Sequence, residues 1–210
     1  MLEKSKFNFI LDEIEKIYPD ASCELNYRNI YELSVAVILS AQTTDKKVNI
    51  VTKELFKKYS NIEQLANGKE EDLKEIIKPL GLASSKSKNL ILMAKKVVES
   101  FDGIIPSNIN DLLTLNGIGR KCANVILCEG YNIPAFPVDT HIERISKRMN
   151  LVDENASVLE IENTLIKMME EERYHKAHHL LIHFGRYFCT ARSPKCDICF
   201  YNKKCCYNKN

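Results

Sequence analysis

The chain is poor in the residues and runs that mark fibrous, disordered or membrane proteins. Of its 210 residues only seven are glycine and six are proline, which excludes a collagen-like or low-complexity chain. Its longest uncharged apolar stretch, residues 33–41, contains two serines and is far shorter than the roughly 20 residues that a membrane-spanning helix needs. The first residues lack the apolar run of a secretory signal. We therefore expect a cytoplasmic protein that does not enter a membrane.

The chain also has little net charge. Thirty lysines and arginines against 28 aspartates and glutamates leave +2 at pH 7, which says little about the partners of the whole protein. The charge is unevenly distributed, because residues 186–210 carry six basic side chains and a single acidic one, while the rest carries 24 basic and 27 acidic residues. A basic tail on a slightly acidic body is suited to contact with phosphate groups.

Period-two alternation, the pattern of a half-buried β-strand, is missing over any useful length. Apolar residues instead recur every three or four positions, which predicts helices. Helical patterns occur at about residues 7–17, 31–41, 48–59, 73–77, 90–101, 120–130, 141–150, 158–168 and 175–188. Ser157 and Glu160 have the spacing of a capping box, which predicts a helix start there with Val158 facing inwards. The sequence therefore predicts an all-α fold.

Five of the eight cysteines lie near the C-terminal end. Those at 189, 196, 199 and 205 have the spacing C-x6-C-x2-C-x5-C, and Cys206 follows directly. Because disulfides are rare in a reducing cytoplasm, metal-binding thiolates are the better interpretation. Structural zinc usually takes paired short-spaced cysteines, whereas one C-x2-C with a cysteine outside each end is more typical of an iron–sulfur cubane. The spacing favours a cluster and leaves open zinc and a ligand role for Cys206.

The segment around Gly117 and Gly119 predicts a tight hairpin between two short helices. Apolar residues up to Leu115 end the first helix, the two glycines permit a close turn, and Arg120 begins the second helix. The amides at that helix start are suited to a phosphate oxygen. Lys121 lies in the first turn, where the helix dipole disfavours an ammonium and favours the neutral, nucleophilic amine. A solvated or phosphate-contacting lysine is the alternative interpretation.

Another helix is predicted to begin in residues 137–141, Pro-Val-Asp-Thr-His. Asp139 is a candidate N-cap, and Thr140 with Glu143 has capping-box spacing, so either residue could satisfy the helix start. A capping carboxylate still faces out beyond the helix end, where it can assist a proton transfer or stabilise a cation. Asp139 is therefore a candidate catalytic residue as well as a candidate cap.

These motifs together resemble endonuclease III, a family of helix-hairpin-helix DNA glycosylase/AP lyases that carry a [4Fe–4S] cluster. The resemblance rests on Leu-Asn-Gly-Ile-Gly-Arg-Lys at 115–121, Val-Asp-Thr-His at 138–141 and the four-cysteine loop at 189–205. It covers essentially the whole chain and implies the family's fold, two helical domains with a cleft between them. A six-helix barrel is expected at 22–133 and a cluster domain at 1–21 and 134–210. A monomer associated with the nucleoid is also implied.

The resemblance implies roles for residues that carry chemistry. Lys121 matches the family's Schiff-base lysine, and Asp139 matches its catalytic aspartate. The expected ligands of the [4Fe–4S] cluster are Cys189, Cys196, Cys199 and Cys205.

Other matched residues are expected to contact DNA. Gln42 matches the glutamine that fills the gap left by an extruded nucleotide, and Leu82 matches an apolar wedge in a second intercalating loop. Gly117, Gly119 and Arg120 form the hairpin that is expected to hold the DNA backbone.

Three positions near the expected site depart from the family. Asn116 stands where proline is usual in the hairpin, and Cys122 stands where threonine is common after the lysine. Because asparagine readily adopts turn conformations, we expect the hairpin to form with looser pre-organisation. Glu143 adds a carboxylate after the Asp-Thr-His segment and is expected to alter the local potential.

A run of histidines on the last predicted helix has the spacing of a metal stripe. His175, His179 and His183 recur every four residues, and His178 lies beside them. Hydrogen-bonded or exposed histidines are the better interpretation, because the resemblance requires no second metal.

The function implied is that of a bifunctional DNA glycosylase and AP lyase of base excision repair, acting on damaged double-stranded DNA. It would remove oxidised pyrimidines through a lysine Schiff base and cut 3′ to the abasic site by β-elimination. One alternative is a mismatch-specific glycosylase of the same superfamily, whose members generally lack a lysine at the position of Lys121. The other is a non-catalytic iron–sulfur DNA-binding module, which needs neither Lys121 nor Asp139. Strand cleavage that depends on Lys121 distinguishes the three.

Overall fold

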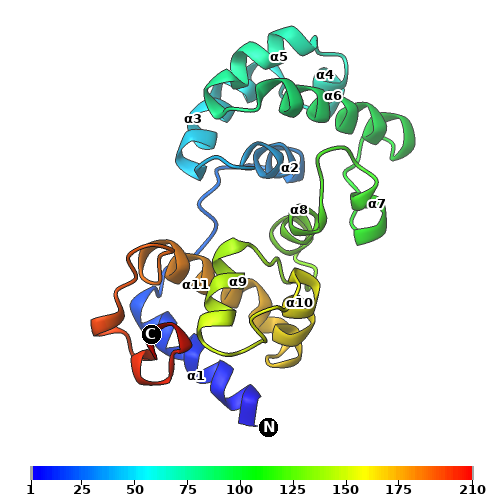
Figure 1. The fold of residues 1–210 in the computed structure, drawn as a ribbon. Coiled ribbons are helices and arrows are strands. Elements are labelled where there is room, and N and C mark those ends of the chain that lie inside the picture. Colours follow the sequence, from blue (N-terminus) through cyan, green and yellow to red (C-terminus); the bar gives the residue numbers. More distant parts are fainter. Residues whose placement is uncertain (1, 210) are drawn as a thin grey trace. The chain divides into compact units, whose positions relative to one another are not determined.

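The computed structural model describes residues 2–209 as helices joined by loops (Figure 1). Within that range the structure contains no strand, so the all-α prediction is confirmed. None of the helices there is long and apolar enough to cross a membrane. The chain divides into two compact units, which we call the hairpin unit, Cys23–Ile133, and the cysteine unit, Met1–Ser22 with Pro134–Asn210.

The hairpin unit contains the helices α2 to α8, a 3₁₀ turn and a π-helix. Their bounds are Ile30–Leu39 for α2, Asp45–Lys58 for α3, Ile62–Ala66 for α4, Glu70–Ile77 for α5, Lys78–Leu80 for the 3₁₀ turn η1, Ala83–Ser100 for α6, Ile109–Leu113 for α7, Arg120–Val125 for α8 and Ile126–Gly130 for the π-helix η2.

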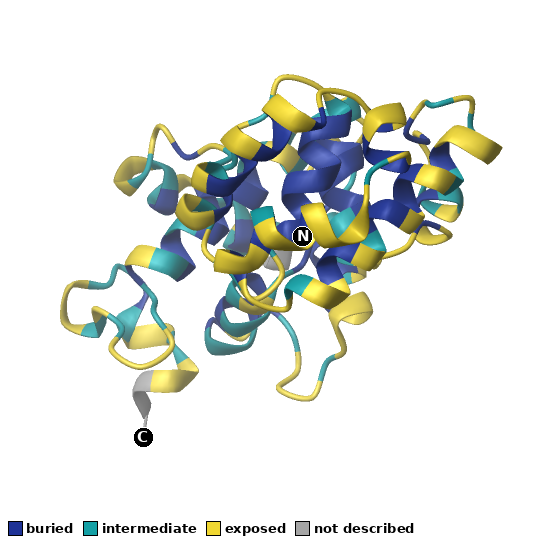
Figure 2. Cartoon of the chain, turned by 90° about the horizontal axis from the view of Figure 1, so that it is seen from above, coloured by how far each residue is buried: buried dark blue, intermediate teal, exposed yellow. Residues whose placement is uncertain are grey.

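The core of the hairpin unit is built around α2. This helix is apolar apart from Glu32 and Ser34, and every residue from 31 to 39 is buried, as expected for a helix enclosed by others. It contacts α3, α6, α8 and η2, while α6 packs against α4 and α5. Figure 2 shows buried stretches inside the helices and exposed residues on outer turns and loops. The long helix α6 therefore connects the core helix α2 with the helices α4 and α5.

The cysteine unit contains four α-helices in its described residues, together with short 3₁₀ turns. Their bounds are Leu2–Ile17 for α1, Thr140–Arg148 for α9, Val158–Lys167 for α10, Glu171–Arg173 for η3, Tyr174–Tyr187 for α11, Cys196–Ile198 for η4, Asn202–Lys204 for η5 and Cys206–Lys209 for η6.

The helix α11 is the packing partner of both α1 and α9 in the cysteine unit. The apolar stripe of α1 is buried from Phe7 to Ile14, as its periodicity predicts, whereas Ile17 at its end is exposed. The contact with α9 depends on Gly185, because a Cβ there would lie 2.7 Å from the Cβ of His141. Glycine thus lets the helix that begins after Asp139 lie close to the helix that leads into the cysteine-rich loop.

The predicted capping box of α10 is present, with Ser157 and Glu160 each bonding to the other's backbone amide. The prediction that Val158 faces inwards is wrong, because its side chain is 43% exposed. Val158 is the first residue of the helix, beyond the stretch that packs on the core, and the buried stripe starts at Ile161.

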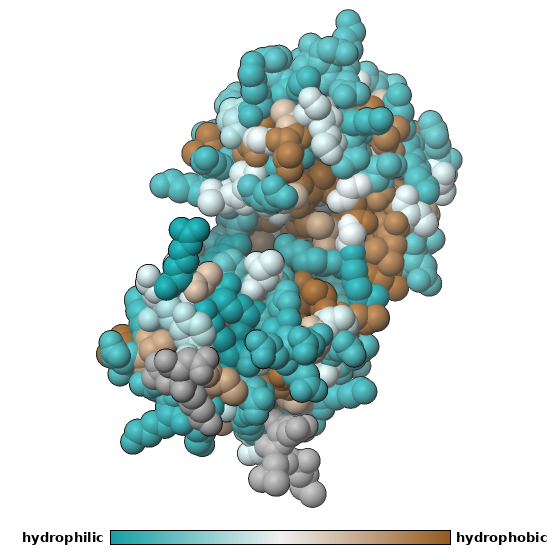
Figure 3. All heavy atoms as spheres, viewed as in Figure 1, coloured by the Kyte–Doolittle hydropathy of each residue, from teal (hydrophilic) through white to brown (hydrophobic). Residues whose placement is uncertain are grey.

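The exposed surface in the view of Figure 3 is largely hydrophilic, with hydrophobic patches.

Candidate functional site

The predicted hairpin joins α7 to α8 through residues 114–119. Backbone hydrogen bonds of 3.1 Å from the Leu115 amide and 3.2 Å from the Ile118 amide close its two turns. Gly117 has a φ of +80°, in the left-handed region where glycine is favoured. A Cβ there would lie 3.1 Å from Asn89 Cβ and 3.3 Å from Ile38 Cγ2. Gly117 is therefore required by its backbone angle and by close packing on α6 and α2.

Gly119, the second glycine of the predicted turn, does not depend on the conformational freedom of glycine. Its φ of −93° and ψ of 178° are accessible to any residue, and an added Cβ would meet nothing within 4 Å. It is the N-cap of α8, which begins at Arg120 as predicted and has no side-chain cap. Because Gly119 has no side chain, the first backbone amides of α8 stay open to a ligand.

Lys121 is the second residue of α8 and is half-buried. Its positive charge acts on the thiol of Cys23, in the same unit, and lowers the pKa of that thiol. Burial and the Glu129 carboxylate act in the opposite direction, and together they raise the pKa of Cys23 to about 11. Lys121 is therefore a half-buried residue in the neighbourhood of Cys23.

The predicted plug and wedge residues, Gln42 and Leu82, both project from exposed turns with left-handed backbone angles. Their φ values are +55° and +51°, and Leu82 is 56% exposed. A branched apolar residue in this region is unusual and indicates local strain. The two turns lie side by side, because the Thr43 hydroxyl donates a 2.7 Å hydrogen bond to the Leu80 carbonyl. The sequence carried no sign of this strain or of this link.

Asp139 is the N-cap of α9, and its Oδ1 accepts hydrogen bonds of 2.9 Å from the amides of both His141 and Ile142. Of the two caps left open by the sequence, Asp139 rather than Thr140 therefore fills the role. The cap uses one carboxylate oxygen, so Oδ2 is not needed to hold the helix. The carboxylate is half-buried at the start of α9.

The three departures from the family are accommodated locally. Asn116 is exposed in a hairpin that is fully formed, and Cys122 packs against the small apolar cluster of α2 and α8. Glu143 is paired with Lys147, whose Nζ lies 2.7 Å from a carboxylate oxygen. The partner one turn away offsets the negative charge that Glu143 was expected to add.

The four predicted ligand cysteines line one cavity in the cysteine unit. The residues around it are Arg148, Met149, Phe188, Cys189, Pro194, Lys195, Cys196, Cys199, Tyr201, Asn202, Cys205 and Tyr207. Burial raises the pKa of the Cys199 thiol, and Cys189, Cys205 and Cys196 raise it further, so the four sulfurs are close enough to repel one another as thiolates. Cys206 is exposed and does not line the cavity.

Short turns in series explain the spacing of three of these cysteines. The amides of Cys199, Asn202 and Cys205 each bond to the carbonyl three residues earlier, at distances of 3.1, 3.1 and 3.2 Å. Successive turns of this kind bring Cys196, Cys199 and Cys205 to one side of the loop. Four soft thiolate donors around one cavity match the ligand set of an iron–sulfur cluster, so the residues present fit that group.

Two arginines of α9 hold the first cysteine, and the sequence analysis did not identify them. Arg148 donates to Cys189 Sγ at 3.4 Å and to the Thr190 carbonyl at 2.7 Å, and its guanidinium lies 3.8 Å from the ring centre of Tyr207. Arg144 donates to the Cys189 carbonyl at 3.0 and 3.2 Å. Arginines four residues apart share one helix face, and this was the signal available in the sequence.

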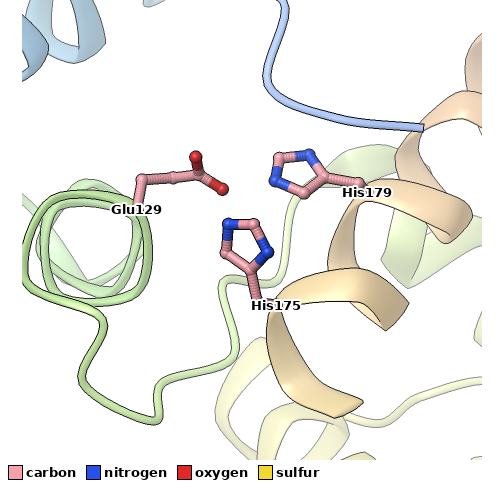
Figure 4. A group of neighbouring side chains, drawn as sticks. All are labelled: Glu129, His175 and His179. Atoms are coloured by element: carbon pink, nitrogen blue, oxygen red, sulfur yellow. The ribbon is translucent and has the colours of Figure 1, made fainter. Parts of the chain in front are cut away.

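The histidines of α11 act mainly as hydrogen-bonding residues within the cysteine unit, as expected. The rings of His178 and His183 lie 3.1 Å from the carbonyls of Pro137 and Ser22. His175 and His179 project from successive turns of α11 with ring centres 4.8 Å apart (Figure 4). Glu129, labelled in the same view, belongs to η2 of the hairpin unit.

Two family models match the chain. The model described as HhH-GPD superfamily base excision DNA repair protein matches residues 35–171. The model described as the iron–sulfur binding domain of endonuclease III matches residues 189–200, which include three of the four cysteines that line the cavity.

Individual relatives resemble the chain over almost its whole length. The endonuclease III of Bacillus subtilis (strain 168) is 44% identical over 95% of this chain and 91% of the relative. The solved structure of a non-covalent endonuclease III–DNA complex is 42% identical with a TM-score of 0.96, and the match covers 100% of this chain and 98% of that chain. A trapped endonuclease III–DNA covalent intermediate matches with the same identity, TM-score and coverage.

Proposed function

The chain belongs to the endonuclease III family, and from that membership we propose that it is a bifunctional DNA glycosylase and AP lyase of base excision repair. It removes a damaged base from duplex DNA and then cuts the strand 3′ to the abasic site. The observation that carries the proposal is the position of Lys121. This lysine lies directly after the hairpin, in a chain that is 42% identical over its full length to an endonuclease III trapped covalently on DNA.

The first step is exposure of the damaged nucleotide. A base inside a duplex is out of reach, so the nucleotide is rotated out at a cost of a few kcal/mol, which weak stacking of a damaged base reduces. Gln42 and Leu82 fill the space it leaves, because both are exposed on neighbouring turns that are joined by a hydrogen bond. The hairpin around Gly117 and Gly119 and the start of α8 at Arg120 hold the phosphate backbone.

Lys121 carries the chemistry of both bond cleavages. As a neutral amine its Nζ attacks C1′ of the sugar, and the C1′–N bond to the base breaks as the base leaves with the bonding electrons and a proton. The amine supplies the proton that the base takes up, and the C1′–O4′ bond then breaks as O4′ gains a proton from solvent, which leaves an iminium between Nζ and C1′. The iminium acidifies C2′, so removal of a C2′ proton expels the 3′ phosphate by β-elimination.

Asp139 supports these steps with a carboxylate at a fixed position. Capping by Oδ1 anchors the side chain on α9, and Oδ2 is left to accept a proton or to stabilise positive charge on the sugar.

The cofactor is a [4Fe–4S] cluster held by Cys189, Cys196, Cys199 and Cys205. When bound, the cluster supplies four iron–thiolate bonds that fix the fold of the C-terminal loop. Basic residues of this region then present positive charge to the DNA backbone. They are Arg186, Arg192, Lys195, Lys203 and Lys204. Binding that weakens steeply as salt is raised supports this role, and an affinity insensitive to salt contradicts it.

Oxidised pyrimidines such as thymine glycol are the proposed lesions, and the protein acts as a monomer in the cytoplasm on the DNA of the nucleoid. Borohydride trapping tests the proposal with a duplex that contains one thymine glycol. The wild-type protein and Lys95→Ala, which changes an exposed lysine on α6, should form the covalent adduct, while Lys121→Ala should not. An adduct of undiminished yield with Lys121→Ala would overturn the assignment.

A plain abasic duplex separates the remaining possibilities. An adduct on the abasic duplex alone keeps the lyase and rejects thymine glycol as a substrate. Absence of adducts on both duplexes rejects the bifunctional enzyme and favours a mismatch glycosylase or a non-catalytic module.

A further inference from the structure

Lys86 of α6 is a buried lysine, only 4% exposed, in the hairpin unit. Lysine is rarely buried to this degree unless it has partners. Its Nζ lies 2.9 Å from the Thr43 hydroxyl and 3.2 Å from the Leu80 carbonyl. The same hydroxyl donates to the same carbonyl at 2.7 Å, so the three groups form a closed ring of hydrogen bonds.

This ring joins the two turns that carry Gln42 and Leu82. Thr43 follows Gln42 directly, and Leu80 lies two residues before Leu82. Both Gln42 and Leu82 have left-handed backbone angles, which persist only where the surrounding structure holds them. The backbone amide of Lys86 also donates to the Leu82 carbonyl at 2.9 Å, which fixes the start of α6 behind the turn.

Stability of the fold does not account for a lysine at this position. Its two side-chain partners are neutral, and it lies in the first turn of α6, where the helix dipole disfavours positive charge. Burial disfavours the charged form of an amine, and desolvation lowers the pKa of Lys86 accordingly. A buried apolar side chain of similar length would avoid these penalties. The feature that the ammonium adds is a hydrogen-bonded link to both turns.

We propose that Lys86 is a positioning residue that holds the Gln42 and Leu82 turns in one arrangement, so that both side chains enter the DNA together when the damaged nucleotide is extruded. This inference rests on the proposed function, because it assumes that these two residues fill the vacated space. It assigns Lys86 to the extrusion step and not to the reaction of Lys121 with the sugar.

The test compares an abasic site in a fully paired duplex with one in an unpaired bubble, where no stacking has to be broken. Lys86→Met keeps most of the length of the side chain and removes its donors. It should reduce borohydride trapping on the paired duplex by roughly tenfold to a hundredfold, the loss expected for hydrogen bonds to a charged group. Trapping on the bubble should stay within about twofold of wild type, because the chemical step is untouched.

Thr43→Val supplies an independent route to the same link. It removes the hydroxyl that both Lys86 and Leu80 contact, so it should show the same split between the two substrates. The double variant should lose little beyond either single variant, because coupled residues act as a unit. Lys95→Met, which removes an exposed charge from the same helix, should match wild type on both substrates. If Lys86→Met fails to fold, Thr43→Val carries the test alone.

A direct readout of extrusion uses 2-aminopurine beside the lesion in the Lys121→Ala background, where no chemistry occurs. Lys86→Met should reduce the fluorescence increase that reports unstacking. Equal losses on the paired and bubble substrates, or normal unstacking, would overturn the role of Lys86. If Lys121→Ala with intact Lys86 shows no unstacking and the wild-type protein forms no adduct, the proposed function is rejected instead, so the two failures are distinguishable.

Discussion

Capping and catalysis by Asp139 can be separated with two substitutions. Oδ1 accepts both amide hydrogen bonds at the start of α9, so Asp139→Asn keeps an oxygen that can accept them, whereas Asp139→Ala does not. Loss of a side-chain cap lowers the free energy of unfolding by about 1 kcal/mol. Both variants lose the negative charge near the helix start, which contributes about 0.3–1 kcal/mol at an exposed site and up to about 2 kcal/mol at a partly buried one. The alanine variant should therefore be about 1 kcal/mol less stable than the asparagine variant.

Thermal unfolding and base release measure the two roles separately. In a chain of this length, a difference of 1 kcal/mol corresponds to roughly 2–4 °C in Tm. Base release from the thymine glycol duplex should fall in both variants, by about 10²- to 10⁴-fold if the carboxylate transfers a proton. Ser157→Ala is the matched control, because it removes the cap of α10 in the same unit. It should lose similar stability and keep full activity.

Two results would refute this reasoning. Equal Tm values for Asp139→Asn and Asp139→Ala would show that the two amide hydrogen bonds do not stabilise α9. Base release at the wild-type rate by Asp139→Asn would show that the carboxylate takes no part in the reaction.

Three further predictions follow from backbone angles and burial. Gly117→Ala should lower the free energy of unfolding by about 1–2 kcal/mol, because the φ of Gly117 is positive. Gly119→Ala should keep the wild-type urea midpoint and weaken DNA binding. Equal urea midpoints for the two variants would contradict this prediction. At pH 8, iodoacetamide should label exposed Cys206 and spare Cys23, whose pKa burial raises to about 11, and equal labelling by peptide mass spectrometry would contradict this. Burial lowers the pKa of His141, so the unfolded state binds its proton more readily and urea stability should fall as the pH drops below about 6.5. His141→Gln should remove part of that slope, and an unchanged slope would reject the cause.

The longer helices could be predicted because their apolar residues recur over several turns and their ends carry recognisable caps. The start of α10 follows from Ser157 and Glu160, and the buried face of α1 follows from its periodicity. The helix Ile62–Ala66 was missed because a single turn is too short to show a period. The π-helix Ile126–Gly130 was missed because it continues the apolar run of α8, and its widened turn leaves no separate pattern in the sequence.

Sequence motifs indicated a site residue only where its neighbours in the chain form the turn or cap that holds it. Lys121 and Asp139 each lie within a short segment that also forms the local turn or cap, so their sequence context indicates their position. Arg148 was not identified because its partner Cys189 lies 41 residues away in the chain. Lys86 was not identified for the same reason, since its link to Thr43 spans 43 residues and its burial is set by tertiary packing.

Three features of the hairpin unit that break local rules lie at the two turns that we assign to DNA entry. Gln42 and Leu82 adopt backbone angles that their residue types disfavour, and Lys86 is buried behind them with neutral partners. Each feature taken alone reduces stability, and a sequence selected for the fold alone would avoid all three. Their convergence on one hydrogen-bonded ring indicates that the turns are held in a strained, ready conformation. The free enzyme would then meet part of the ordering cost of extrusion before DNA binds.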